Sequence, residues 1–99
     1  MRFYIVVLDR DPAKSYKAFQ EAFVAHPRIY RWAHYLTHGY VIGTDLSVSE
    51  LSNHVTKALQ THSLRTNHLA LRVDLHERQG RLSKDAWEWF QRNEGLDDE

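Results

Sequence analysis

Two acidic side chains follow the most apolar segment of the chain. Phe3 to Leu8 reads FYIVVL, and Asp9 and Asp11 come directly after it. Carboxylates at this spacing can hold Mg²⁺ or Mn²⁺, which prefer oxygen ligands and usually keep several waters. The alternative gives both residues structural roles, with Asp11 as a helix N-cap and Asp9 in a turn. We therefore treat Asp9 as a candidate catalytic residue, and Asp9 with Asp11 as a candidate metal pair.

Histidine is the second residue type that could do chemistry. The chain has 7 histidines and no cysteine. None of them forms the pair one helical turn apart that favours zinc, since His34 and His38 straddle a predicted turn and His54 and His62 are two turns apart. Surface or interface positions explain them better than a structural metal. The sequence also has no glycine-rich phosphate loop and no nucleophile elbow, so we expect no small-molecule cofactor.

Four basic residues could contact nucleic acid. Lys14, Lys17, Arg28 and Arg31 are expected beside the first helix, where they would form either a solvated charged face or a groove for RNA or DNA. Lys and Arg together number 13, as do Asp and Glu, so the formal net charge is +0. Strong nonspecific binding to nucleic acid needs a surplus of positive charge. The composition excludes that class of binder but allows a local basic patch.

The candidate residues depend on a strand that we place at the centre of the sheet. Six consecutive apolar residues, 3 to 8, indicate a strand buried on both faces, because a half-exposed strand would alternate polar with apolar. A helix is predicted to open with Asp11 as N-cap and Pro12 at its first position, and to close at His26-Pro27. Its buried face carries Tyr16, Phe19 and Phe23.

A β-hairpin is predicted from Ile29 to Thr44. Gly39 is expected to take the left-handed position of a type I turn between the two strands. Strict alternation would place Ile29 and Ala33 on one face of the first strand and Trp32 on the other. Neither face is cleanly polar, which is unusual for an isolated sheet.

The second half of the chain shows two helix starts and one strand. Ser47 to Glu50 is a capping box, which opens a helix that runs to about His62. Residues 67 to 75 alternate strictly and predict a half-exposed strand with Leu69, Leu71, Val73 and Leu75 inward. Ser83 caps a last helix whose Trp87 and Trp89 we interpret as packing residues, not as a platform for stacking bases. Residues 96 to 99 are predicted to be a frayed acidic tail.

This element order predicts an α+β fold. The order βαββαβ is the ferredoxin-like arrangement, with an antiparallel sheet in the order 4-1-3-2, here followed by a C-terminal helix within one domain of residues 1 to 95. The crossover helices would cover one sheet face. The other must be covered by the last helix, by a second subunit or by both. An aromatic content of 12% favours a homodimer. No apolar segment reaches the roughly 18 to 20 residues that span a bilayer, so we expect no membrane partner and a cytoplasmic location.

Three blocks of the sequence resemble the SinR-like small proteins of bacteria. They are YIVVLD in the first strand, WAHYLTHGYVIGT in the hairpin with the DLSVSEL cap after it, and AWEWF in the last helix. Those proteins are in turn similar to the Cas-two component of CRISPR spacer acquisition and to the VapD ribonuclease toxins. The SinR-like resemblance covers nearly the whole chain, and the Cas-two resemblance covers about residues 3 to 75.

The resemblance implies a ferredoxin-like homodimer whose sheets face one another. It would bring the Asp that ends the first strand of each subunit to the two-fold axis, and Asp9 matches that residue. The chain departs from the Cas-two pattern at Leu8, where a Tyr is typical, and in the loop Arg10-Asp11-Pro12. It also departs in its Trp-rich C-terminal helix. Fold transfers well across such families and activity transfers poorly.

Two functions follow as hypotheses. The first is a non-catalytic dimeric interaction or scaffold protein, preferred because the net charge is zero and Asp9 is the only candidate catalytic residue. The alternative is an endonuclease or ribonuclease dependent on Mg²⁺ or Mn²⁺, in which Asp9 at the dimer axis holds the metal that activates water.

Overall fold

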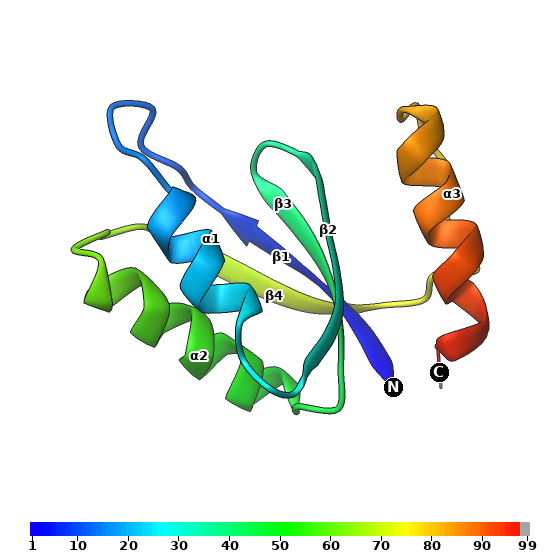
Figure 1. Ribbon diagram of the computed structural model, residues 1–99, viewed down its shortest axis with the longest axis horizontal. Helices are drawn as coiled ribbons and strands as arrows, with labels where there is room; N and C mark the ends of the chain where they lie inside the picture. Colours follow the sequence, from blue (N-terminus) through cyan, green and yellow to red (C-terminus); the bar gives the residue numbers. More distant parts are fainter. Residues whose placement is uncertain (98–99) are drawn as a thin grey trace.

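The fold is α+β, with an antiparallel sheet of four strands and three α-helices. It is seen in a computed structural model that describes residues 1–97 (Figure 1). In chain order the elements are β1 (Arg2–Leu8), α1 (Lys17–Val24), β2 (Ile29–Leu36), β3 (Gly39–Thr44), α2 (Val48–Thr61), β4 (His68–Val73), α3 (Lys84–Asn93) and a 3₁₀ turn (Glu94–Leu96). None of the helices in this part of the chain is long and apolar enough to cross a membrane.

β1 is a central strand, as predicted. It pairs antiparallel with β3 on one side and with β4 on the other. The sheet order is β2-β3-β1-β4, which reads 4-1-3-2 when it is counted from the β4 edge. β2 and β4 are therefore the two edge strands.

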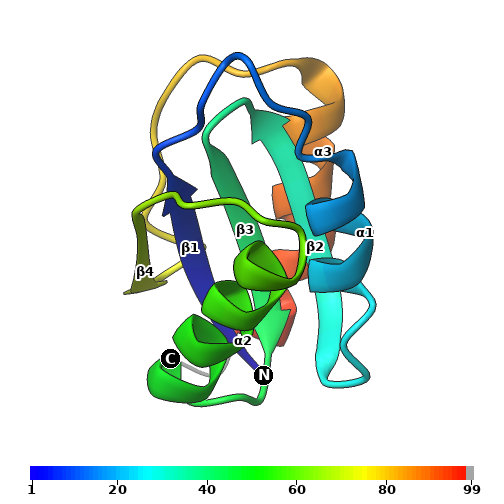
Figure 2. The same cartoon turned by 90° about the vertical axis from the view of Figure 1, so that its left-hand side faces the viewer.

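The sheet separates two hydrophobic clusters of unequal size. α1 and α2 lie on one face and α3 lies on the other (Figures 1 and 2). The larger cluster joins Tyr4, Val6 and Leu8 of β1 to the apolar faces of α1 and α2. The smaller one is built around Phe3 and Trp89, whose rings meet edge to face with centroids 6.2 Å apart. α3 thus covers only part of its face, and Val7 of β1 remains exposed. The prediction that β1 is buried on both faces is wrong for Val7.

The first helix begins later than predicted. α1 starts at Lys17, and Asp11 closes a turn instead of capping a helix. The Asp11 carboxylate accepts a hydrogen bond from Ala13 N at 2.9 Å, and the Asp11 carbonyl accepts one from Lys14 N at 3.1 Å. An Asp-Pro pair is compatible with a helix N-terminus and with a turn. Here the buried Tyr16 favours the turn, because its hydroxyl accepts a hydrogen bond from Asp11 N at 2.8 Å.

The hairpin differs from its prediction in two ways. Gly39 is paired within β3, opposite Leu36 and Val7, and the residues with positive φ in the described chain are Ser63 and Gly80. The prediction that Gly39 takes a left-handed backbone conformation is therefore wrong. The register also shifts between Ile29 and Arg31, so Ile29 joins the larger cluster while Ala33 joins the smaller one. This irregularity breaks the strict alternation from which a shared face was predicted.

The apolar row of β4 does not face the helices. Leu69 pairs with Val7, Leu71 with Ile5 and Val73 with Phe3, so these residues lie on the α3 side of the sheet. Ala70 instead packs against the larger cluster. Leu69 and Leu71 are exposed, and the prediction that they point inward is wrong. Val73 and Leu75, nearer to α3, are partly buried and buried respectively.

Both helix starts in the second half agree with their predictions. The hydroxyl of Ser47 accepts from Glu50 N, and the carboxylate of Glu50 accepts from Ser47 N, which completes the capping box of α2. Ser83 caps α3, and Trp89 is buried as a packing residue.

The last part of the described chain takes part in the fold. Asp97, which was placed in a frayed tail, accepts a hydrogen bond from Leu75 N at 2.9 Å, and its other oxygen lies 3.6 Å from the guanidinium of Arg72. Residues 98 and 99 of the predicted tail lie outside the described residues.

Candidate functional site

The most distinctive surface is the part of the sheet that α3 leaves uncovered. We call it the open face and define it by five side chains: Ile5, Val7, Leu36, Leu69 and Leu71. Val7 is 39% exposed, Leu36 58%, Leu69 55% and Leu71 48%. Because Val7 pairs with Leu69 and Ile5 with Leu71, these four side chains form one continuous row across β1 and β4.

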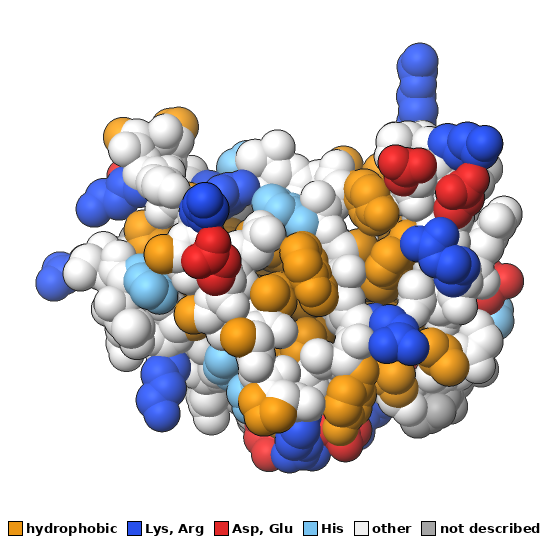
Figure 3. All heavy atoms as spheres, in the orientation of Figure 1, with side chains coloured by type: hydrophobic (Ala, Val, Ile, Leu, Met, Phe, Trp, Pro, Cys, Tyr) orange, Lys and Arg blue, Asp and Glu red, His pale blue; other side chains and the backbone are white. Residues whose placement is uncertain are grey.

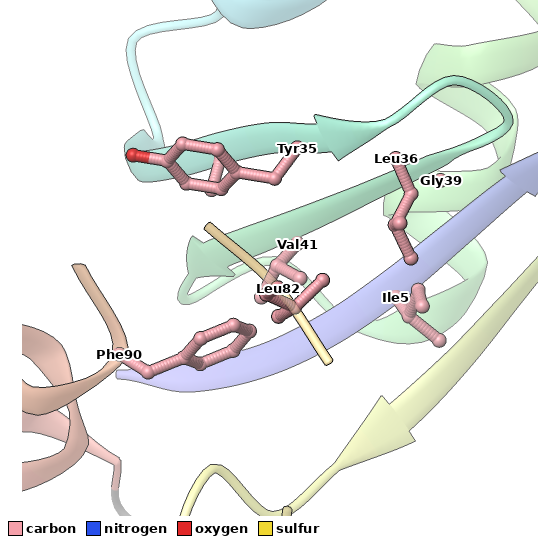
Figure 4. A pocket seen from close by; sticks show the side chains of 8 residues that line it. Ile5, Tyr35, Leu36, Gly39, Val41, Leu82 and Phe90 are labelled. Carbon is pink, nitrogen blue, oxygen red and sulfur yellow. The ribbon is translucent and has the colours of Figure 1, made fainter. Parts of the chain in front are cut away.

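A groove runs beside this row, between the sheet and the segment that carries α3. Leu36 points from β2 toward Ile5 of β1, and the ring of Phe90 points from α3 toward Val41 (Figure 4). Leu82 lies over the sheet between them (Figure 4). A space-filling view from the side of β2 shows hydrophobic side chains gathered in its centre and along the side toward α3 (Figure 3). Because Ile5 belongs to both the row and the groove, the groove continues the apolar surface of the open face.

Asp9 lies at one end of the open face. It is exposed and lines a hollow of about 440 Å³ together with His38, Asn67, His68 and Leu69. Its backbone is fixed by a hydrogen bond from Asp9 N to the carbonyl of Asn67 at 3.0 Å. Burial lowers the pKa of His68, whose Nε2 lies 2.8 Å from the hydroxyl of Ser52. The Asp9 carboxylate is thus open to solvent and shares its hollow with the imidazole of His68.

The structure gives the two residues of the predicted metal pair different surroundings. Asp11 lines a different hollow from Asp9, and one of its oxygens already accepts from Ala13 N. Among residues 1–97 there is no group of three His, Cys, Asp or Glu side chains that could hold a metal ion. A metal ion bound by Asp9 would take its further ligands from water, from a substrate or from a second chain.

The predicted basic groove is divided between the two ends of α1. Lys14 precedes the helix, whereas Arg28 follows it and pairs with Asp45 at 2.8 Å and with Glu50 at 3.7 Å. The hydrogen bond from Arg28 lowers the pKa of Asp45. Arg31 donates to the carbonyl of Tyr30 at 2.9 Å. The charge of Arg28 is therefore largely balanced by its neighbours.

Lys17 is the remaining residue of that predicted groove. It is exposed at the first position of α1, and its backbone N donates to the hydroxyl of Ser15 at 3.3 Å. It thus stands with Lys14 at the start of the helix, away from Arg28.

One histidine pair was not foreseen from the sequence. The rings of His26 and His54 lie 4.7 Å apart between the end of α1 and α2. His26 Nδ1 accepts from Arg28 N at 3.0 Å, and His54 Nε2 lies 2.7 Å from the carbonyl of Phe23. Burial lowers the pKa of His26, and the neighbouring His54 and Arg28 lower it further. Their separation of 28 positions gives no local signal that could have revealed the contact.

The open face was also missed, although its residues were identified. Alternation in residues 67 to 75 finds the apolar row but not the side of the sheet on which it lies. The small Ala70 between the two leucines is the one signal of which side faces the helices, since a small residue suits close approach of a helix.

The chain was compared with protein-family models, with curated proteins and with solved structures, and it matches none of them.

Proposed function

We propose that this chain is an interaction protein of ferredoxin-like fold that forms a homodimer through its open face. The observation that carries the proposal is the row of exposed aliphatic side chains on β1 and β4. Contiguous apolar patches on otherwise polar proteins mark interaction sites. The resemblance to the SinR-like and Cas-two groups supports the same arrangement, with sheets face to face.

The chemistry of the face favours a protein over a nucleic acid as its partner. Sheets that bind single-stranded RNA present aromatic rings on their central strands for stacking with bases. Here the exposed or partly exposed side chains that the central strands place on this face are Ile5, Val7 and Val41, which offer no ring, and the exposed ring of Tyr35 stands on the edge strand β2. Arg31 shares this side of the sheet but lies on the edge strand β2. An aliphatic face of this kind suits another apolar surface.

A second copy of the chain fits the face better than an unrelated partner. The ridge of Leu69 and Leu71 lies on the edge strand β4, and the groove lined by Leu36 and Phe90 lies on the other side of β1. In a two-fold dimer the same patch of both subunits meets itself, so each ridge can enter the groove of the other copy. A net charge of +0 adds no overall repulsion between two copies.

The state of assembly tests this proposal. We expect light scattering to give the mass of two chains at micromolar concentration. The variant Leu69→Gln/Leu71→Gln should weaken the dimer by about 100-fold or more, because four exposed leucines per dimer each contribute on the order of 1 kcal/mol. The control is Lys57→Gln, which changes an exposed residue farther along α2 and should leave the dimer intact. A single-chain mass for the wild type, or an undiminished dimer of the double variant with normal circular dichroism, would contradict it.

A metal-dependent endonuclease or ribonuclease is the second candidate. It is favoured by the position of Asp9, which is exposed at the end of β1 and shares its hollow with Leu69 of the open face. The face-to-face dimer implied by the resemblance would place two such carboxylates near its axis, where they could share one Mg²⁺ or Mn²⁺ ion. This candidate depends on the dimer, while the interaction function does not depend on Asp9.

A further inference from the structure

A separate hollow lies between the loop that follows β1 and the loop that precedes β4. It has a volume of about 220 Å³. Its lining residues are Asp11, Lys14, Tyr16, Ser63, Arg65 and Thr66. All six carry a polar or charged group, in contrast to the aliphatic open face. The hollow is therefore built for a polar ligand.

Both walls of the hollow are fixed by contacts within the protein. Tyr16 is buried, and its hydroxyl lies 2.9 Å from the hydroxyl of Thr66 and accepts a hydrogen bond from Asp11 N. The guanidinium of Arg10 lies over the Tyr16 ring, 4.5 Å from its centroid. On the other wall, the buried Leu64 holds the loop in the core, with its N bonded to the carbonyl of Leu59 at 2.9 Å. A ligand would bind here without first ordering either loop.

The cations of the hollow are unpaired. Lys14 comes from one wall and Arg65 from the other, and neither side chain forms an ion pair or hydrogen bond with any described residue. The hydroxyl of Ser63 is likewise without a partner in the described chain. Asp11 is the one carboxylate of the lining, and one of its oxygens already accepts from Ala13 N. Two positive charges against one negative charge leave the hollow attractive to an anion.

We propose that this hollow binds a phosphate group. The guanidinium of Arg65 can donate two parallel hydrogen bonds to phosphate oxygens, and Lys14 and Ser63 can donate from the same cavity. A phosphate dianion has enough charge to engage both cations, whereas a carboxylate has one negative charge. The hollow is smaller than the roughly 300 to 1,000 Å³ of pockets that enclose a drug-sized ligand, so it takes the phosphate and leaves the rest of a larger molecule outside.

Titration of the full-length protein with inorganic phosphate tests the site. We expect saturable shifts of the backbone amide NMR signals of residues 13 to 16 and 63 to 66, measured against sodium chloride at equal ionic strength. Lys14→Gln and Arg65→Gln should each weaken binding by about tenfold or more, because each removes a charge-assisted hydrogen bond. Lys57→Gln and Arg92→Gln are the matched controls, since both residues are exposed elsewhere, and they should bind phosphate as the wild type does. Shifts that do not saturate, or binding that survives in both site variants, would overturn the proposal.

A second arm identifies the source of the phosphate. A nucleoside 5′-monophosphate is compared with the same nucleoside without its phosphate. If the monophosphate shifts the same amides, the phosphate group belongs to a nucleotide, and if only inorganic phosphate does so, the ligand is the free ion. Equal binding of the nucleoside and its monophosphate at these amides would refute a phosphate site.

The phosphate site does not rest on the proposed dimer. None of its lining residues belongs to the open face, so the variant Leu69→Gln/Leu71→Gln should keep the wild-type phosphate affinity. Failure of either proposal thus leaves the other standing.

Discussion

Asp9 and Asp11 are two positions apart, yet they belong to different parts of the protein. Asp11 closes a turn beside Tyr16, whereas Asp9 stays exposed at the end of β1. The spacing of the two carboxylates could not decide between a metal pair and structural roles, because an Asp-Pro pair serves both. The deciding contact is the Tyr16 hydroxyl, whose bond to Thr66 joins residues 50 positions apart. A contact of that range leaves no local trace in the sequence.

We expect metal ions to leave the stability of the isolated chain unchanged. Asp9 has no set of neighbouring ligands within the described chain, so millimolar Mg²⁺ or Mn²⁺ should not move the melting temperature. Asp9→Asn should alter the free energy of unfolding by less than about 0.5 kcal/mol, since Asn suits an exposed turn as well as Asp. Thermal melting of the monomeric variant Leu69→Gln/Leu71→Gln, with and without each ion and with and without Asp9→Asn, measures both effects. A rise in melting temperature with metal that is lost in Asp9→Asn would favour the nuclease instead.

At the scale of elements, the predictions that succeeded rest on local chemistry. The caps of α2 and α3 were predicted because a Ser hydroxyl bonds to an amide only three residues away. Three other predictions were wrong: the residue at which α1 starts, the strict alternation of side chains along β2, and the sheet face on which the leucines of β4 lie. Each depends on a neighbour that is distant in the chain: Thr66 for α1, β3 for β2 and β1 for β4. The periodicity of a strand shows which side chains share a face, but it does not show which face packs against the helices.

The attachment of α3 to the sheet should depend on one residue. Trp89 is buried against Phe3, so Trp89→Ala should lower the free energy of unfolding by about 3 kcal/mol or more. Trp87→Ala should cost less than half as much, because Trp87 is only partly buried, near Arg78. Urea unfolding followed by circular dichroism compares the two variants. Equal losses would show that α3 is not held through Trp89.

At the scale of the whole molecule, two histidines in different places couple stability to pH. His26 lies after α1 and His68 at the start of β4, and both have pKa values below the ordinary 6.5. Burial is the main cause for each, and His54 and Arg28 act with it on His26, against weaker opposite effects of Asp45 and Glu50. The unfolded chain therefore binds more protons than the folded one as the pH falls below 6.5. Stability from these groups is present above that pH and is lost below it.

We expect the free energy of unfolding to decrease between about pH 7.5 and about pH 5. The variant His26→Asn/His68→Asn should show a flatter dependence, because it removes both groups that the folded state keeps neutral. His76→Gln, a change at an exposed histidine, serves as the control and should follow the wild-type curve. Urea unfolding at several pH values measures the slope. A slope that the double variant leaves unchanged would show that other groups carry the pH dependence.

The position of β4 also bears on how the chain can misassemble. It is an edge strand, so its outer backbone groups have no partner strand among residues 1–97, and Leu69 and Leu71 project from its uncovered side. A free edge beside an apolar row is the usual template for uncontrolled strand addition and amyloid growth. Arg72 interrupts the segment His68–Val73 with a charge and is held near Asp97, which makes it a gatekeeper against such growth. Burying the leucines in an ordered assembly would therefore protect the chain from aggregation as well as give it a function.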